Sequence, residues 1–208
     1  MTTTTGAKPH PIFLAGRWVE SPDPLIVANP ARPGEPAGAT YHATPEQYEE
    51  AVDAAVAAFE VTRNLPAYER GAILRNISNG IKARREELGR LIALEAGKPL
   101  RDALTEVDRA TLTFRLGAEE AERIYGEVIP LDLNPASRGR VGITRRFPIG
   151  PVAGISPFNF PLNLAAHKVA PALASGNPIV LKPPSKDPLV MLTVAEIIEE
   201  AGAPAGSV

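Results

Sequence analysis

The spacing of hydrophobic residues changes several times along the chain, and each change predicts a different kind of element. Apolar residues three and four positions apart predict three helices between Thr44 and about Tyr125. The first has a capping box, because Thr44 can cap it, Pro45 suits its first position and Gln47 can reach back. The face expected to be buried on this helix carries Tyr48, Val52, Val56 and Phe59.

The second expected helix is long, starting at Pro66 and ending at Gly97 and Pro99. Its apolar stripe predicts which side chains are buried, namely Ile73, Leu74, Ile77, Ile81, Leu88, Leu91 and Ile92. The third helix continues to about Tyr125, and its buried side is expected to hold Leu104, Val107, Phe114, Ala118 and Ala121.

Alternating or continuous apolar runs predict strands elsewhere. Residues 12–19 predict a β-hairpin that turns at Gly16, and the proline-rich stretch 21–38 predicts extended surface chain with a short strand at 25–27. Residues 140–147 alternate, which predicts a strand with one solvent-exposed face and an apolar face made of Val141, Ile143 and Phe147.

The stretch 150–184 predicts the unit around which the chain is organised. Two short apolar runs, 152–156 and 179–181, flank a helix begun by Pro161, and Pro171 should kink that helix or end it early. Fully apolar strands joined by a helix indicate a parallel βαβ unit. A last helix follows, capped by Asp187 and ended by Gly202, with an inward face of Val190, Val194, Ile197 and Ala201.

Ligands of parallel sheets bind at the carboxyl ends of the strands, and here those ends carry Asn159 and Lys182. A side-chain amide has N–H donors that do not titrate, which suits an oxyanion, and Pro157 and Pro161 stiffen its turn. The alternative is that Asn159 only bonds its own turn. Lys182 could reach ribose or phosphate oxygens, or could be an ordinary solvated lysine.

Composition narrows the function classes. The 208 residues include 22 basic and 24 acidic side chains, a net charge of −2 and 44% hydrophobic residues, which indicates a globular protein without a nucleic-acid-binding face. No apolar run approaches a membrane helix, and residues 1–11 resemble a disordered tail rather than a secretory signal, so we expect a cytoplasmic protein. Cysteine is absent, which excludes disulfides and a cysteine nucleophile within these residues, and three scattered histidines predict no metal site.

The strings SPFNFPLN and PIVLKPPS, together with EAGKPL, PALASGNPIVLKP and AGAP, resemble the aldehyde dehydrogenase superfamily from about Phe13 to the end. The resemblance implies an α/β fold in which an incomplete doubly wound parallel sheet follows a helical segment and a β arm strand. It divides the chain into a tail (1–11), a hairpin and helical part of the cofactor domain (12–136), an oligomerisation arm strand (137–149) and the first βαβα of the dinucleotide-binding domain (150–208).

The resemblance also implies roles for single residues. Asn159 would donate to the oxygen of a cysteine thiohemiacetal, and Lys182 would bind the adenosine ribose of NAD or NADP. Ser185 departs from the Glu of many NAD-preferring relatives, so NADP should be tolerated, unless Ser185 only caps the next helix. The nicotinamide half of the cofactor would be bordered by Ile155, Ser156, Pro157 and Phe158, although Phe158 could equally be a core residue.

Other charged residues near this stretch carry weaker expectations. Lys168 matches a family lysine near the active site, yet a solvated or salt-bridged lysine is the preferred interpretation, and His167 is expected to be structural. Arg145 and Arg146 favour strand solubility or a subunit contact.

Taken with the family, the sequence predicts the amino-terminal part of an NAD(P)-dependent aldehyde dehydrogenase that oxidises an aldehyde to an acid. The cysteine and general base lie outside this chain, which should therefore be inactive by itself. The alternative is a non-catalytic cofactor-binding remnant or a partner-dependent subunit. Partners would be a small aldehyde and either another copy through residues 137–149 or a chain supplying the missing half.

Overall fold

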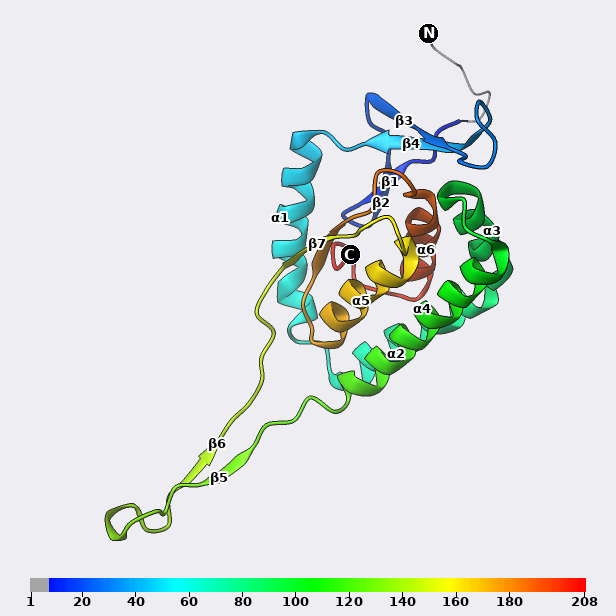
Figure 1. Ribbon diagram of the computed structural model, residues 1–208. Helices are drawn as coiled ribbons and strands as arrows, with labels where there is room; N and C mark the ends of the chain where they lie inside the picture. Colours follow the sequence, from blue (N-terminus) through cyan, green and yellow to red (C-terminus); the bar gives the residue numbers. More distant parts are fainter. Residues whose placement is uncertain (1–7) are drawn as a thin grey trace.

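Two parallel strands form the centre of the fold. In the computed structural model, which describes residues 8–208, β7 (Val152–Ile155) and β8 (Ile179–Lys182) pair in parallel. Val152 lies opposite Ile179, and Ile155 lies opposite Lys182. Helix α5 (Pro161–Ala174) joins the strands, as Figure 1 shows, so the expected βαβ unit is confirmed. The expected α/β class with an incomplete parallel sheet is confirmed as well.

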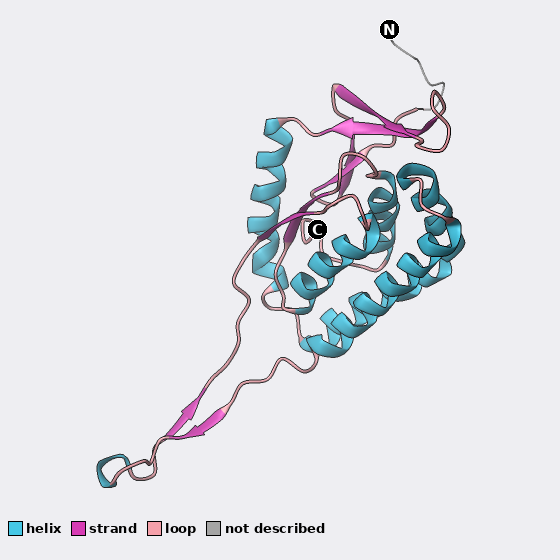
Figure 2. Cartoon of the chain, viewed as in Figure 1, coloured by secondary structure: helices cyan, strands magenta, loops and turns pink. Residues whose placement is uncertain are grey.

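Helices cover this pair of strands. Helix α5 packs on both strands, α1 (Pro45–Thr62) packs against β8, and α6 (Leu189–Glu200) packs against α5, α2 and α3. A layer formed by α2 (Ala67–Ala83), α3 (Arg85–Ala96) and α4 (Leu100–Ala121) lies outside α5, and Figure 2 shows how far helices dominate this part of the molecule. The largest fully buried apolar side chains join these layers and include Phe114, Leu74, Ile77, Ile81, Leu88, Ile92, Leu162 and Ile197.

The expected long helix from Pro66 to Gly97 is divided in two. At Arg84 the backbone leaves the helical region, with φ −94° and ψ 20°, and its N–H bonds to the Gly80 carbonyl. The Arg84 guanidinium is held there by Glu87 and by Glu196 of α6. Most of the predicted stripe is nevertheless buried, because α3 continues in a direction that keeps Leu88 and Ile92 against α4. Gly97 ends α3 with φ 66°, as expected.

Helix α1 begins as predicted but packs through a different face. Thr44 and Gln47 form the capping box. The residues expected to be buried, however, are exposed or half-buried, and the buried ones are Ala55, Ala58 and Thr62. The reason is close packing: the chain at Gly206 passes so near α1 that a Cβ there would lie 2.9 Å from the Ala54 carbonyl oxygen. This close approach is made at Ala54 and Ala58, while Tyr48, Val52 and Val56 stay exposed.

Two antiparallel hairpins form the amino-terminal part. Strands β1 (Ile12–Leu14) and β2 (Arg17–Val19) meet at the predicted turn, where Ala15 and Gly16 both have positive φ. The short strand expected at 25–27 is confirmed within β3 (Asp23–Ala28), but the stretch is a second hairpin rather than surface chain, since β3 pairs with β4 (Pro36–His42). Of the expected disordered tail, residues 1–7 lie outside the described part, whereas His10 is placed by a bond from its N–H to the Ala39 carbonyl.

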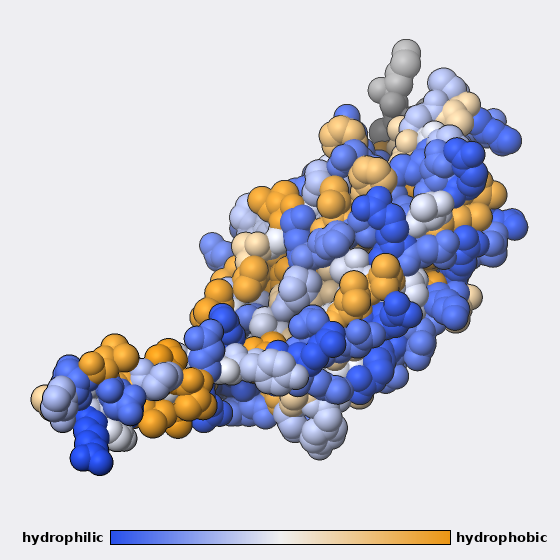
Figure 3. All heavy atoms as spheres, turned by 60° about the horizontal axis from the view of Figure 1, so that its bottom comes forward, coloured by the Kyte–Doolittle hydropathy of each residue, from blue (hydrophilic) through white to orange (hydrophobic). Residues whose placement is uncertain are grey.

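A projecting arm connects α4 to the centre of the fold. It consists of β5 (Val128–Pro130), a short 3₁₀ turn η1 (Pro135–Ser137) and β6 (Val141–Ile143), with β5 and β6 antiparallel. The strand is therefore shorter than the predicted 140–147, and its partner β5 was not predicted. Val141, Ile143 and Phe147 are all exposed, so the alternation marks no buried face here, and Figure 3 shows hydrophobic residues gathered on the arm.

The ends of α5 and α6 correct two further expectations. Helix α5 runs through Pro171 to Ala174 rather than ending early. Helix α6 begins after Pro188 without a bond to the Asp187 side chain, so Asp187 is not its cap. The predicted inward face of α6 is buried, and Gly202 ends that helix with φ 81°.

Candidate functional site

The turn after β7 exposes the Asn159 side chain to solvent. The Ser156 N–H donates to the Lys182 carbonyl at 3.0 Å, which extends the strand pairing by one step before the chain turns into α5. Asn159 is exposed, and within residues 8–208 no hydrogen bond joins its side chain to another residue. The side-chain amide therefore makes no hydrogen bond within the turn, and its N–H groups can donate to a ligand.

Lys182 and Ser185 meet at the carboxyl end of β8. The Lys182 ammonium donates to the Ser185 hydroxyl at 3.2 Å and to the Pro183 carbonyl at 3.1 Å. Both side chains line a mainly apolar groove beside β8, bordered by Tyr41 and Tyr48. Lys182 is half-buried, so it is neither a freely solvated lysine nor one enclosed in hydrocarbon. Ser185 makes no cap of α6 in the described hydrogen bonds, which removes that alternative.

The remaining residues proposed to border the cofactor fall into two groups. Ile155, Pro157 and Phe158 are exposed, so Phe158 is not a core residue. The Lys186 ammonium lies 4.5 Å from the centroid of the Phe158 ring, which brings the loop after β8 against the loop after β7. Ser156 is buried, and its hydroxyl oxygen has no hydrogen-bond partner in the part of the chain that the structure describes.

A buried glutamate on α4, Glu106, accepts hydrogen bonds from the start of α5, directly after the Asn159 turn. Glu106 Oε1 accepts from the N–H groups of Leu162 and Asn163 at 3.0 and 3.1 Å, and thereby caps α5, which lacks a side-chain cap of its own. Glu106 Oε2 pairs with the Lys98 ammonium. The same ammonium donates to the Asn159 carbonyl at 3.0 Å.

A second buried glutamate, Glu95 on α3, caps α6 after the loop that follows β8. Glu95 accepts from the N–H groups of Leu189 and Val190, both at 2.8 Å, and so caps α6. Burial raises the pKa of Glu95 to about 8, opposed by these two N–H groups and aided by the negative charges of Asp187 and Glu106. Burial, together with repulsion from Glu106, likewise raises the pKa of Asp187 to about 7.

Glu95 and Glu106 were not predicted as functional residues from the sequence, although one indication was present. Glu106 falls between Ala103, Val107 and Ala110 on the face of α4 that helical spacing predicts to be buried. A carboxylate at such a position must find donors or a cation, because an unpaired buried charge is very costly. Which donors it finds depends on segments more than 50 residues away, and no local pattern shows that.

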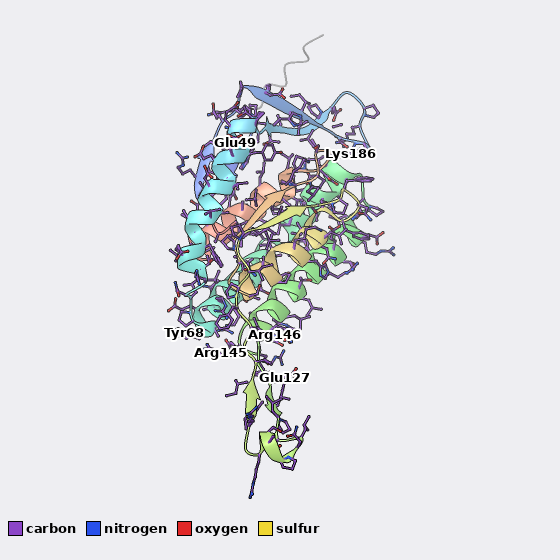
Figure 4. All side chains as sticks on the ribbon, turned by 90° about the vertical axis from the view of Figure 1, so that its left-hand side faces the viewer. Glu49, Tyr68, Glu127, Arg145, Arg146 and Lys186 are labelled. Atoms are coloured by element: carbon purple, nitrogen blue, oxygen red, sulfur yellow. The ribbon has the colours of Figure 1, made fainter. Side chains whose placement is uncertain are left out.

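The other charged candidates lie apart from the two loops. The Lys168 ammonium donates to the Leu164 carbonyl of its own helix at 3.1 Å, and His167 is exposed. Arg145 and Arg146 lie at the base of the arm, far from Lys186, as Figure 4 shows, and the Arg145 guanidinium stacks on Phe147. In residues 8–208 no group of three or more acidic, histidine or cysteine side chains is placed to hold a metal ion, and no helix there is long and apolar enough to span a membrane.

Comparison with known proteins identifies the family. The model of the aldehyde dehydrogenase family matches residues 18–208. A 3-sulfolactaldehyde dehydrogenase of Priestia aryabhattai is 39% identical over 206 residues, which is 99% of this chain and 43% of that protein. The chain therefore belongs to the aldehyde dehydrogenase family, and it spans about two fifths of the length of the curated relatives it matches.

Solved structures agree with this assignment. Aldehyde dehydrogenase 21 of Physcomitrella patens, in complex with the reaction product succinate, superposes with a TM-score of 0.91 at 44% identity, covering 97% of this chain and 42% of that one. An NADP-dependent glyceraldehyde-3-phosphate dehydrogenase of Bacillus halodurans, complexed with NADP, gives a TM-score of 0.90 at 34% identity, covering 96% and 42%.

Proposed function

We propose that the chain is the amino-terminal part of an NAD(P)-dependent aldehyde dehydrogenase, a cytoplasmic enzyme that oxidises an aldehyde to a carboxylic acid. The observation that carries this proposal is that the two polar residues follow the carboxyl ends of adjacent parallel strands: Lys182 ends β8, and the turn after β7 carries an exposed Asn159 amide that bonds no other described residue. Family membership supplies the reaction class. The thiolate nucleophile comes from outside these residues, since the chain contains no cysteine.

Asn159 is proposed to stabilise the oxyanion that forms when a thiolate attacks the aldehyde. An amide N–H donates at any working pH, and a donor that is already oriented needs no rearrangement as negative charge develops on oxygen. The fixed turn supports this role, because Pro161 begins α5 and the Asn159 carbonyl is held by Lys98.

The loop residues fit a dinucleotide, which supplies a hydride acceptor when it is bound. The Lys182 ammonium and Ser185 hydroxyl, 3.2 Å apart, can both donate to ribose or phosphate oxygens. The Ser156 hydroxyl near the end of β7 is buried and has no hydrogen-bond partner among residues 8–208, and Ile155, Pro157 and Phe158 beside it are exposed. A serine at 185 does not repel a 2′-phosphate, and one structural relative is complexed with NADP.

The cofactor assignment is tested by titrating NADP and NAD against the wild-type chain and against Ser185→Glu. The added carboxylate should weaken NADP binding about tenfold through repulsion of the 2′-phosphate and leave NAD binding within about twofold. Ser185→Ala is the size-matched control for loss of the hydroxyl alone. Equal effects on both nucleotides would contradict the placement of Ser185 at the ribose.

The catalytic assignment is tested by activity. The purified chain should produce no aldehyde-dependent NAD(P)H, and turnover should appear only when a cysteine-containing remainder is supplied. Asn159→Ala should then lower kcat by about a hundredfold, as expected for one oxyanion donor, with a small change in nucleotide affinity. Aldehyde-dependent NAD(P)H formation by the chain alone would contradict the proposal.

A second candidate function is a non-catalytic subunit that binds the cofactor or depends on a partner. The exposed apolar residues of the arm, Val128, Leu133, Val141 and Ile143, favour association with another copy or another chain. Sedimentation of the wild-type chain against a variant with Val141→Asp and Ile143→Asp tests this. A monomeric wild-type chain would argue against association through the arm.

A further inference from the structure

We propose that Lys98 and Glu106 are positioning residues for Asn159: they hold the turn that aims its amide, through a buried ion pair on the inner side of the α5 start. The inference rests on the proposed function, since it matters for chemistry only if Asn159 is the oxyanion donor. It adds two residues from outside the 150–208 unit to the machinery of that unit.

The Lys98 ammonium touches three parts of the structure at once. It pairs with Glu106, donates to the Asn159 carbonyl at 3.0 Å and lies 4.2 Å from the centroid of the Phe160 ring. The carbonyl and the ring belong to consecutive residues of the turn, so one cation fixes both the position and the orientation of this dipeptide.

Glu106 fixes the other end of the same turn. Its side chain is fully buried, and one of its oxygens accepts from the first-turn N–H groups of Leu162 and Asn163. A carboxylate at a helix start also interacts favourably with the helix dipole. The residues from Asn159 to Asn163 are therefore attached to α4 and to the α3–α4 connection at both ends.

Burial makes this arrangement more specific than a surface ion pair. The side chain of Lys98 is 16% exposed and that of Glu106 is 0% exposed, so water competes little for either group. Removing one partner leaves the other charged and uncompensated, which is why such pairs maintain a single geometry. The Phe160 carbonyl also accepts from the Leu164 N–H of α5 at 3.0 Å, whereas among the described residues the Asn159 carbonyl accepts only from Lys98.

The test measures the mobility of the turn by chymotrypsin cleavage. The Phe158–Asn159 bond lies in the exposed turn, whereas the bond after Phe114 is buried in α4 and is cut only on global unfolding. Lys98→Met keeps the apolar stem and removes the ammonium. It should raise cleavage at Phe158 at least about tenfold, because the lost ion pair no longer opposes opening of the turn. Cleavage after Phe114 measures how far global unfolding rises in the same variant, and cleavage at Phe158 should remain the faster of the two.

Three further variants complete the experiment. Lys98→Arg should return cleavage at Phe158 to within about twofold of wild type, since it restores a cationic donor. The double variant Lys98→Met with Glu106→Gln should also loosen the turn; it removes both buried charges and so remains informative if Lys98→Met unfolds. Asp108→Asn removes an exposed carboxylate two positions along α4 and should change nothing.

Wild-type cleavage at Phe158 in Lys98→Met and in the double variant would overturn the inference, and so would cleavage at Phe158 that is no faster than cleavage after Phe114, because the turn would then open only on global unfolding. The assay uses neither nucleotide nor aldehyde. If the wild-type chain binds no nucleotide, the proposed function alone is refuted. If the chain binds nucleotide but cleavage at Phe158 is unchanged in the variants, this inference alone is refuted.

Discussion

The starts of α5 and α6 are built alike but differ in charge. Each helix follows one strand of the parallel pair, each lacks a side-chain cap of its own, and each receives a buried glutamate from the α3–α4 layer. Glu106 has a cation, Lys98, on its second oxygen. Glu95 has no ion pair among the described residues, and its second oxygen accepts another backbone N–H instead.

This difference separates the loops beside the proposed oxyanion donor and the proposed ribose site. At α5 the negative charge is neutralised locally by Lys98, so the Asn159 turn is held by a complete ion pair. At α6 burial raises the pKa of Glu95 to about 8, so the cap takes up a proton near neutral pH. We infer that the second loop responds to pH.

The largest expected effect is that of Glu106→Ala. It leaves Lys98 without its buried partner and two backbone N–H groups unbonded, so the free energy of unfolding should fall by about 4 kcal/mol. Urea unfolding followed by circular dichroism measures this. Asp108→Ala on the same helix removes an exposed carboxylate and should cost less than about 1 kcal/mol. Similar losses in both variants would show that burial of the pair is unimportant.

The pH dependence of stability tests the other helix start. An acid whose pKa is raised in the folded state binds more protons when folded, so stability is lost as pH rises from its ordinary value to the raised one. For Glu95 this window runs from 4.5 to about 8. We expect the free energy of unfolding to fall across it by on the order of 3 kcal/mol, measured by urea unfolding at several pH values.

Glu95→Gln provides the matched comparison, because an amide oxygen still accepts from the backbone and carries no charge. The fall in stability with rising pH should shrink by more than half in this variant. A dependence as steep as that of wild type would assign the titration to another group, of which Asp187 is the nearest candidate.

Asp187→Asn is expected to stabilise the protein at high pH, by less than Glu106→Ala destabilises it. One Asp187 oxygen is buried without a hydrogen-bond partner in the described chain, and burial together with repulsion from Glu106 raises the pKa of Asp187 to about 7. Above that pH the variant should be about 1 kcal/mol more stable than wild type, and well below it the two should be equal. Thermal unfolding at both pH extremes measures the difference, and destabilisation at high pH would mean that the charge of Asp187 is needed.

Local patterns predicted much of the fold. The capping box at Thr44, the turn at Gly16 and the two apolar strands around α5 depend on neighbouring residues, and all three are confirmed. The division at Arg84 and the outward face of α1 were missed, because they depend on Glu196 and on the chain at Gly206. Helical periodicity shows that a face is buried only when another element is free to cover it.

The candidate site was predictable to the same extent. Asn159, Lys182 and Ser185 stand out because they follow strands, and their roles remain predictions. The glutamates that support their loops could not be paired with α5 and α6, since those contacts span 56 to 95 positions. The expected cap at Asp187 was wrong for the same reason: its position suited a cap, but Glu95 occupies the N–H groups.

The start of α1 supplies the last test, because its cap is entirely local. Thr44 accepts from the Gln47 N–H, and the Gln47 side chain accepts from the Thr44 N–H at 2.9 Å. Thr44→Ala should therefore cost about 1 kcal/mol, a typical value for an N-cap, against about 4 kcal/mol for Glu106→Ala. The same urea unfolding measures both variants, and Thr44→Ser should restore wild-type stability. Equal losses at Thr44 and Glu106 would contradict this difference, because the buried charge and its cation would then contribute no more than a half-buried hydroxyl cap.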